Sequence, residues 1–172
     1  MQLAMNYEAL DWWQNNDVRL AFSYAIDREA LVAAALNGYG YPAYGVAPNG
    51  LAGENLTHSV MARDLDKAKE YLAASSVPNG FDFTMYVSQA RSQAYDVALV
   101  VQQNLKALNI NAEIVTLTQD EVYAYQFGNI LDAEGIRDYD CLVTTWGADY
   151  PDPSANLDPL FNIANIGAGG YN

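Results

Sequence analysis

The sequence predicts an α/β fold in which a mixed, largely parallel sheet is flanked by helices. Two observations lead to this prediction. From residue 81 onward, segments with the two-residue period of strands alternate with segments that have the period of helices. Half of the 172 residues are apolar, which is enough for one sizeable core and argues against disorder. Because no internal repeat divides the chain, we expect a single α/β lobe over residues 1–172.

Three strands are expected, at residues 81–87, 110–117 and 140–146. In the first, apolar side chains from Phe81 to Val87 alternate with polar ones, as in a strand with one buried face. A helical segment lies between each strand and the next. Such crossovers are right-handed and bring the strands parallel, which gives the sheet its expected direction.

Helical spacing predicts five helices, and capping residues mark several of their ends. Asp17 is expected to cap a helix that begins at Val18 and stops at Gly38. Thr118 and Glu121 have the spacing of a capping box. The other helices are expected at 64–72, 94–108, 118–128 and 153–161, with an ordered loop over 38–60 and a turn at 78–80.

The net charge of the chain limits the kinds of molecule that it can bind. Lys and Arg number 8 and Asp and Glu number 21, so the net charge is −13. That charge repels nucleic acid and anionic lipid and suits cationic or zwitterionic ligands. The single cysteine, Cys141, excludes an internal disulfide. The loop-like sequence of Ile166–Asn172 leads us to expect a fragment of a longer protein.

The segment Val143–Pro153 is the strongest candidate for a binding site. It continues a predicted buried strand, and ligands of open α/β sheets bind just beyond the carboxyl ends of strands. Trp146 supplies an aromatic ring, Gly147 bare backbone and Asp149 a carboxylate that suits an ammonium group. The alternatives remain that Asp149 is a turn residue and that Trp146 belongs to the core.

Other apparent signals in the sequence carry less weight. His58 is the only histidine, and Cys141 lies within a predicted strand, so we expect neither a metal site nor a cofactor. An acidic stretch over 132–140 lacks the spacing of a calcium loop. The Gly-x-Gly-x-x-Ala pattern at 38–43 follows a helix rather than a strand, so we interpret it as a false positive.

Three segments, in this order, resemble the extracytoplasmic solute-binding proteins of bacterial ABC importers for oligopeptides, dipeptides and nickel. Asp17–Arg28 resembles the family's helix signature, an Asp-x-Arg-x-Ala run that ends in Ala-Ile-Asp-Arg. Asp64–Leu72 followed by Pro78–Gly80 resembles its short helix and turn. Trp146–Pro153 is similar to its ligand-site segment. The resemblance covers nearly all of the chain, as part of the C-terminal lobe of a two-lobe protein with a periplasmic-binding-protein-like fold.

The resemblance implies how a ligand is held. Asp149 would bind the N-terminal ammonium of a peptide, and the backbone of Trp146, Gly147 and Ala148 would pair with the peptide as an added strand. Tyr150 would complete the substrate-binding segment. The implied protein is not an enzyme. It is monomeric, lies outside the cytoplasmic membrane, and works with the membrane permease subunits of an importer.

Three alternatives stay open from the sequence. A member of the same family could bind a nickel complex, a sugar or an opine instead of a peptide. A protein of another class, a glycosidase, could use Asp149 and Asp152 as its carboxylate pair, which requires the two groups to face each other about 5–9.5 Å apart. The isolated chain could also be an interaction fragment that binds nothing by itself.

Overall fold

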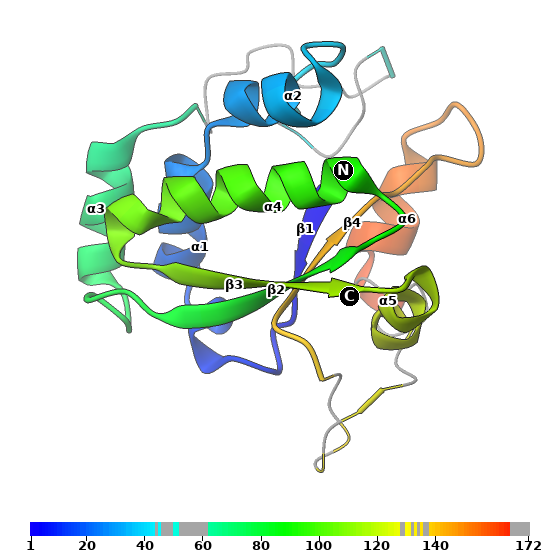
Figure 1. The fold of residues 1–172 in the computed structure, drawn as a ribbon. Helices are drawn as coiled ribbons and strands as arrows, with labels where there is room; N and C mark the ends of the chain where they lie inside the picture. The colour runs from blue at the N-terminus through cyan, green and yellow to red at the C-terminus, as the bar shows by residue number, and fades with distance from the viewer. Residues whose placement is uncertain are drawn as a thin grey trace.

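The computed structural model describes residues 1–43, 45, 50–51, 62–127, 130–131, 133, 135 and 138–165. Three helices follow the first strand, and strands and helices alternate from residue 82 onward (Figure 1). The strands are β1 (Gln2–Met5), β2 (Asp82–Ser88), β3 (Asn111–Leu117) and β4 (Cys141–Thr144). The helices are α1 (Asn16–Ala25), α2 (Arg28–Leu36), α3 (Leu65–Ala74), α4 (Ser92–Leu105), α5 (Gln119–Gln126) and α6 (Ser154–Phe161), with short 3-10 turns η1 (Asp11–Gln14), η2 (Lys106–Leu108) and η3 (Ile163–Asn165).

The sheet has the order β1-β4-β2-β3 and is mixed but largely parallel, as predicted. β2 runs parallel to β3 and to β4, with Phe83 opposite Ala112 and Met85 opposite Cys141. β1 pairs antiparallel with β4. The sequence analysis did not predict β1, because its four residues, Gln-Leu-Ala-Met, do not alternate between polar and apolar. β4 therefore lies between two neighbours, and all four of its residues are buried.

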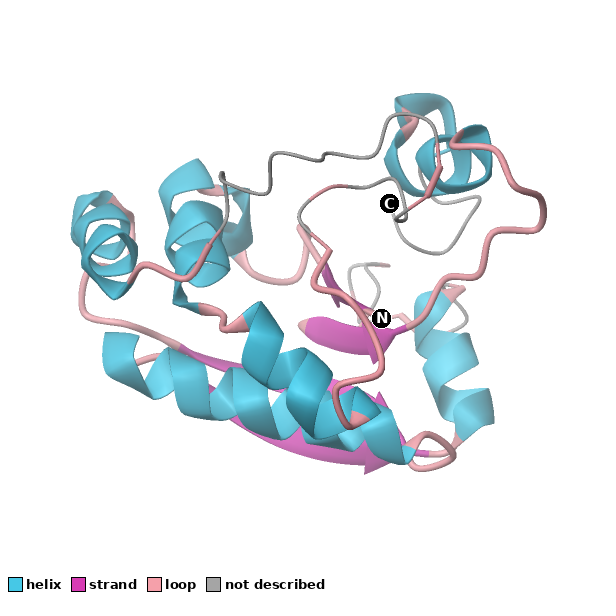
Figure 2. Ribbon diagram, turned by 90° about the horizontal axis from the view of Figure 1, so that it is seen from above, coloured by secondary structure: helices cyan, strands magenta, loops and turns pink. Residues whose placement is uncertain are grey.

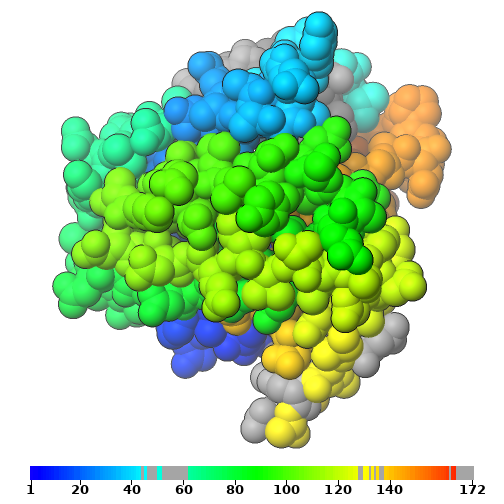
Figure 3. Space-filling view, viewed as in Figure 1, coloured from blue at the N-terminus to red at the C-terminus, as the bar shows by residue number. Residues whose placement is uncertain are grey.

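Helix α4 lies along the two long parallel strands, as Figure 2 shows from above. Its buried side chains, such as Val101 and Leu105, join Met85 and Val87 of β2 in one apolar core. Helix α2 packs on the outer side of α4, and the two form a continuous surface in Figure 3. α1 packs against α3, and this pair extends the same core.

An aromatic cluster anchors the turn η1 to the start of β2. The Trp13 side chain is fully buried, and its ring meets those of Phe22, Phe81 and Phe83 edge-on, with centroids 5.4–5.6 Å apart. Edge-to-face pairs of this kind each add about 0.5–1.5 kcal/mol beyond the area that they bury. The cluster therefore fixes η1 and α1 against the start of β2.

The helix predicted from Val18 to Gly38 is in fact two helices. Ile26 and Asp27 adopt extended backbone angles between α1 and α2, although apolar residues keep their helical spacing on both sides. The break is stabilised by tertiary contacts: the Asp27 amide donates to Asn104 Oδ1 of α4 at 2.6 Å, and Asp27 Oδ1 accepts from the Ala30 amide. The cap of α1 is Asn15 rather than Asp17, whose own amide donates to Asn15 Oδ1.

The remaining predicted elements are confirmed with small shifts at their ends. Asp64 caps α3, and Thr118 with Glu121 forms the capping box of α5. The strand predicted over 140–146 is shorter, because the chain leaves the sheet after Thr144. No helix among the described residues is long and apolar enough to cross a membrane. Most of the predicted loop over 38–60, the helix stop at Gly128 and the end at 166–172 lie outside the described residues.

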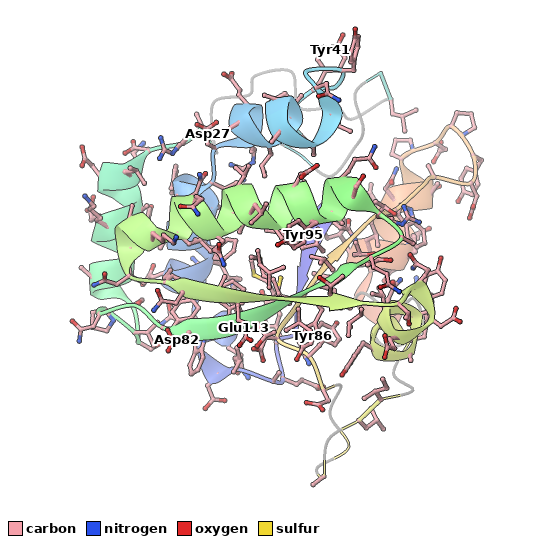
Figure 4. The ribbon with its side chains drawn as sticks, in the orientation of Figure 1. Asp27, Tyr41, Asp82, Tyr86, Tyr95 and Glu113 are labelled. Atoms are coloured by element: carbon pink, nitrogen blue, oxygen red, sulfur yellow. The ribbon has the colours of Figure 1, made fainter. Side chains whose placement is uncertain are left out.

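The sheet face that points away from α4 is more polar at the start of β2 and β3. Asp82, Tyr86 and Glu113 project on this side in Figure 4. The Tyr86 ring stacks on Tyr125 of α5, with centroids 5.3 Å apart. Helix α5 thus covers the end of this face near the carboxyl ends of the strands.

Candidate functional site

The predicted site segment leaves the sheet at the carboxyl end of β4, the position that the sequence indicated. Val143 and Thr144 are buried, Thr145 and Trp146 are half-buried, and the chain from Gly147 to Tyr150 is exposed. The segment then turns into α6. A buried strand thus carries an exposed stretch of backbone at the edge where α/β sheets bind ligands.

The Trp146 side chain is fixed to α6. Its indole Nε1 donates to the carbonyl oxygen of Ala155 at 2.9 Å, and the ring is only half-buried. Trp146 therefore serves the fold and also keeps part of its ring exposed beside the segment. The hydrogen bond to Ala155 gives Trp146 a role in the fold, and its role as a ligand wall stays a prediction.

Asp149 is exposed, and its carboxylate has no hydrogen-bond or ion-pair partner among the described residues. Gly147 is also exposed, and a Cβ atom added there would meet no described atom within 4 Å. The packing of the described residues therefore explains neither the carboxylate at 149 nor the glycine at 147. Both remain available to a group that approaches from outside.

Asp152 has a different role, as a turn residue that accepts hydrogen bonds at the start of α6. Its Oδ1 accepts from the Ser154 amide at 2.9 Å and from Ser154 Oγ at 2.6 Å, at the start of α6. These hydrogen bonds lower the pKa of the Asp152 carboxyl. Tyr150 joins the same turn, since its hydroxyl lies 3.2 Å from Ser154 Oγ. Asp149 is thus a carboxylate with no partner in the described part of the chain, whereas Asp152 is a structural turn residue.

Arg91 is a feature of this edge that the sequence analysis missed. It lies three residues after the end of β2 and donates from Nη1 to Thr145 Oγ1 at 2.8 Å, so it links the segments that follow β2 and β4. Asp149 was singled out because ligands of open α/β sheets bind just beyond the carboxyl ends of strands. The same rule applies to Arg91, a charged residue beyond the carboxyl end of β2. A guanidinium here offers a positive charge beside the segment that carries Asp149.

A small cavity of about 40 Å³ lies behind Arg91, between the strand ends and α5. Ser88 of β2 donates from its hydroxyl to Gln119 Oε1 at 2.9 Å at its wall. Gln126 of α5 also lines the cavity and is only 3% exposed. The remaining lining residues are Val122, Tyr123, Val143, Thr144 and Thr145.

A second, open groove of about 510 Å³ lies at the opposite end of the strands. Its carboxylates are Asp82, Glu113 and Asp140, and Asp140 Oδ2 accepts from the Thr84 amide at 2.7 Å. Within the described part of the chain, no three His, Cys, Asp or Glu residues lie close enough to hold a metal ion. Burial raises the pKa of the Cys141 thiol, and His58 lies outside the described residues.

Comparisons with known proteins agree with this architecture. The model of the family described as bacterial extracellular solute-binding proteins, family 5 Middle, matches residues 1–168. The glutathione-binding protein GsiB of Escherichia coli (strain K12) is 33% identical over 153 residues, which are 89% of this chain and 29% of GsiB. The chain thus spans less than a third of the length of this relative.

Two solved structures share the fold of the chain. The PBP AgaA from A. tumefaciens R10, in complex with agropinic acid, has a TM-score of 0.78 and 26% identity, over 92% of this chain and 31% of AgaA. The periplasmic binding protein DppA from Helicobacter pylori, in complex with the peptide STSA, has a TM-score of 0.75 and 25% identity, over 92% of this chain and 29% of DppA. With the strand-end site and the match of the family model, they lead to one conclusion: the chain belongs to the bacterial extracellular solute-binding proteins, family 5.

Proposed function

We propose that this chain is part of the C-terminal lobe of the solute-binding component of an ABC importer, and that it binds peptides by holding their N-terminal ammonium on Asp149. Proteins of this family are solute-binding proteins of ABC importers, mostly for peptides, and are not enzymes. The observation that carries the proposal is the exposed Asp149 carboxylate, which has no partner among the described residues and follows the buried strand β4.

The surroundings of Asp149 support a peptide ligand. The exposed backbone at Gly147 and Ala148 has N–H and C=O groups that an extended peptide could pair with as an added strand. Such pairing uses groups that all peptides share, so side-chain sequence matters little. Arg91 at the end of β2 adds a positive charge that complements the carboxylate end of a short peptide.

Membership of the family allows us to extend the proposal to the full-length protein. Because the chain spans 29% of GsiB and of DppA, we infer that a second lobe closes over the ligand. The complete protein then lies outside the cytoplasmic membrane as a monomer and delivers its peptide to the permease subunits. The 172 residues alone supply one wall of this cleft, so we expect them to bind peptides weakly or not at all.

Calorimetry on the full-length protein tests the ammonium role. A charge-assisted hydrogen bond contributes about 1.5–3 kcal/mol, so Asp149→Asn should weaken binding of trialanine about 10- to 150-fold. N-acetylation of the peptide should have a similar effect on the wild type and little further effect on the variant. Asp152→Asn is the matched control, because that carboxylate is already hydrogen-bonded to Ser154. Equal affinity for free and acetylated trialanine would exclude this role for Asp149.

A non-peptide solute is the second candidate, since AgaA is seen with agropinic acid. A nickel complex or a sugar is the other alternative that the family suggests. Mass spectrometry of the solute released on denaturing the gently purified full-length protein would identify it. The glycosidase hypothesis is not supported, because family members are not enzymes and the Asp152 carboxylate is bound to Ser154.

A further inference from the structure

Two exposed aromatic side chains lie side by side at the end of α5. Tyr123 and Phe127 are one turn apart, 44% and 51% exposed, with ring centroids 5.9 Å apart. The buried side chains of α5 are Val122 and Gln126, so other positions attach this helix to the sheet. Neighbouring large apolar groups left in contact with water often mark a surface that binds another molecule. The described part of the chain leaves much of both ring surfaces uncovered.

The position of α5 brings this aromatic pair close to the candidate site. In Figure 1, α5 lies beyond the carboxyl ends of β2 and β3. Tyr123 lines the small cavity together with Arg91 and Thr145, and Thr145 directly precedes Trp146. The exposed ring of Tyr123 is therefore within reach of a side chain on a molecule bound along the segment that begins at Trp146. Such a side chain contacts the ring from outside and does not need to enter the cavity.

We propose that Tyr123 and Phe127 form a subsite for one aromatic side chain of the bound peptide, which packs against the exposed face of the Tyr123 ring. This inference rests on the proposed function. There, Asp149 and the backbone after β4 bind groups that all peptides share. The aromatic pair adds a preference among peptides, for an aromatic residue over a small one, at one position of the ligand.

The surroundings of the rings favour an uncharged side chain. A lysine or arginine of the peptide would approach the guanidinium of Arg91, which lines the same cavity as Tyr123. A carboxylate would bind that guanidinium rather than the rings. An aromatic side chain meets other rings in tilted or edge-on pairs, and Tyr123 and Phe127 already form a tilted pair at 45°. A phenyl group would thus extend an existing aromatic contact.

Calorimetry on the full-length protein tests the subsite with trialanine and derivatives that carry phenylalanine or leucine at each position in turn. At one position, phenylalanine should strengthen binding to the wild type about tenfold over alanine and about threefold over leucine. Tyr123→Ser should reduce the tenfold ratio to about twofold and leave the affinity for trialanine unchanged. Phe127→Ser, at the second ring, should also reduce the ratio. Tyr71→Ser is the matched control, because Tyr71 stacks on Tyr24 at the opposite end of the sheet, where α1 and α3 lie in Figure 1.

The same measurements distinguish the peptide from the second lobe as the partner of the rings. If Tyr123→Ser weakens binding of trialanine and of the phenylalanine peptides equally, the ring contacts the closing lobe and the inference is wrong. Equal affinities for the phenylalanine and leucine peptides would contradict the aromatic preference. Binding that depends on Asp149 but shows no phenylalanine preference would overturn this inference alone. If no peptide binds, the proposed function fails as well.

Discussion

Replacement of Gly80 by alanine should destabilise the protein strongly. Gly80 ends the turn before β2 and has a φ angle of +91°. A Cβ atom on it would lie 2.1 Å from the backbone oxygen of Asn109 and 2.6 Å from its carbonyl carbon. Asn109, itself at φ +55°, precedes β3. The two turns that open β2 and β3 therefore touch backbone to backbone, and neither has a flexible side chain that could move aside.

The size of the effect follows from two contributions. A left-handed backbone costs an L-residue about 1–2 kcal/mol. Relief of the overlap requires the turns to separate by about 1 Å, which strains the hydrogen bond from the Asn111 amide to the Phe81 carbonyl and the packing of buried Ile110. Overpacking of this kind costs about 1–3 kcal/mol, and the hydrogen bond contributes about 1 kcal/mol more. We expect a total loss of about 3–6 kcal/mol.

Gly38→Ala is the matched control. Gly38 has a φ angle of +79°, but a Cβ atom there meets no described atom within 4 Å, so only the backbone contribution applies. We expect this variant to lose about 1 kcal/mol. Urea unfolding of both variants, followed by circular dichroism, gives the two free energies of unfolding. If Gly80→Ala loses no more than about 1 kcal/mol beyond Gly38→Ala, the contact between the turns does not have the assigned role.

Three further changes test the caps and the break between α1 and α2. Asn104→Ala leaves the half-buried Asp27 amide without its partner and should lower the free energy of unfolding by about 1–2 kcal/mol in urea titrations. Thr118→Ala removes the capping box and should cost about 1 kcal/mol, while the lowered pKa of Glu121 returns toward its ordinary value. Ser154→Ala should raise the pKa of Asp152 in carbon-detected NMR titrations, because the hydroxyl donor is lost. Since the pKa of Asp152 is lowered in the fold, its contribution to stability is present above the unfolded pKa and is lost as the pH falls through the folded value. An unchanged Asp152 pKa would mean that the backbone donor from Ser154 suffices.

Local patterns predicted most of the fold because those elements carry their own signals. The alternation around Phe83, Met85 and Val87 indicated β2, and Asp64 and Thr118 indicated the helix starts where the structure has them. β1 was missed because it is stabilised by pairing with β4, which is far away in the sequence. No pattern within its four residues predicts that pairing. The separation of α1 from α2 was missed for a similar reason, since Asn104 is 77 residues away from Asp27.

The candidate site likewise has features that the local sequence predicts and features that depend on tertiary contacts. The position of Asp149 followed from a strand-end rule and from the resemblance of its segment to a known family. That its carboxylate meets no partner in the described part of the chain could not be predicted, because this depends on where Ser154 and α6 lie. The strand-end rule could also have identified Arg91, but Arg91 does not lie in a segment that resembles the family. The burial of Gln126 arises only when α5 packs against β2, so no local pattern reveals it.

The hydrogen bond between Trp146 and Ala155 has a consequence for the energetics of recognition. It closes a loop whose ends are the buried strand β4 and the helix α6, and Asp152 fixes the turn within that loop. The residues between them lose their conformational freedom when the chain folds, long before a ligand arrives. A partner that docks here meets a pre-organised edge, and less of its binding free energy is spent on ordering the protein. The affinity of this edge should therefore depend on how rigid the arriving molecule is.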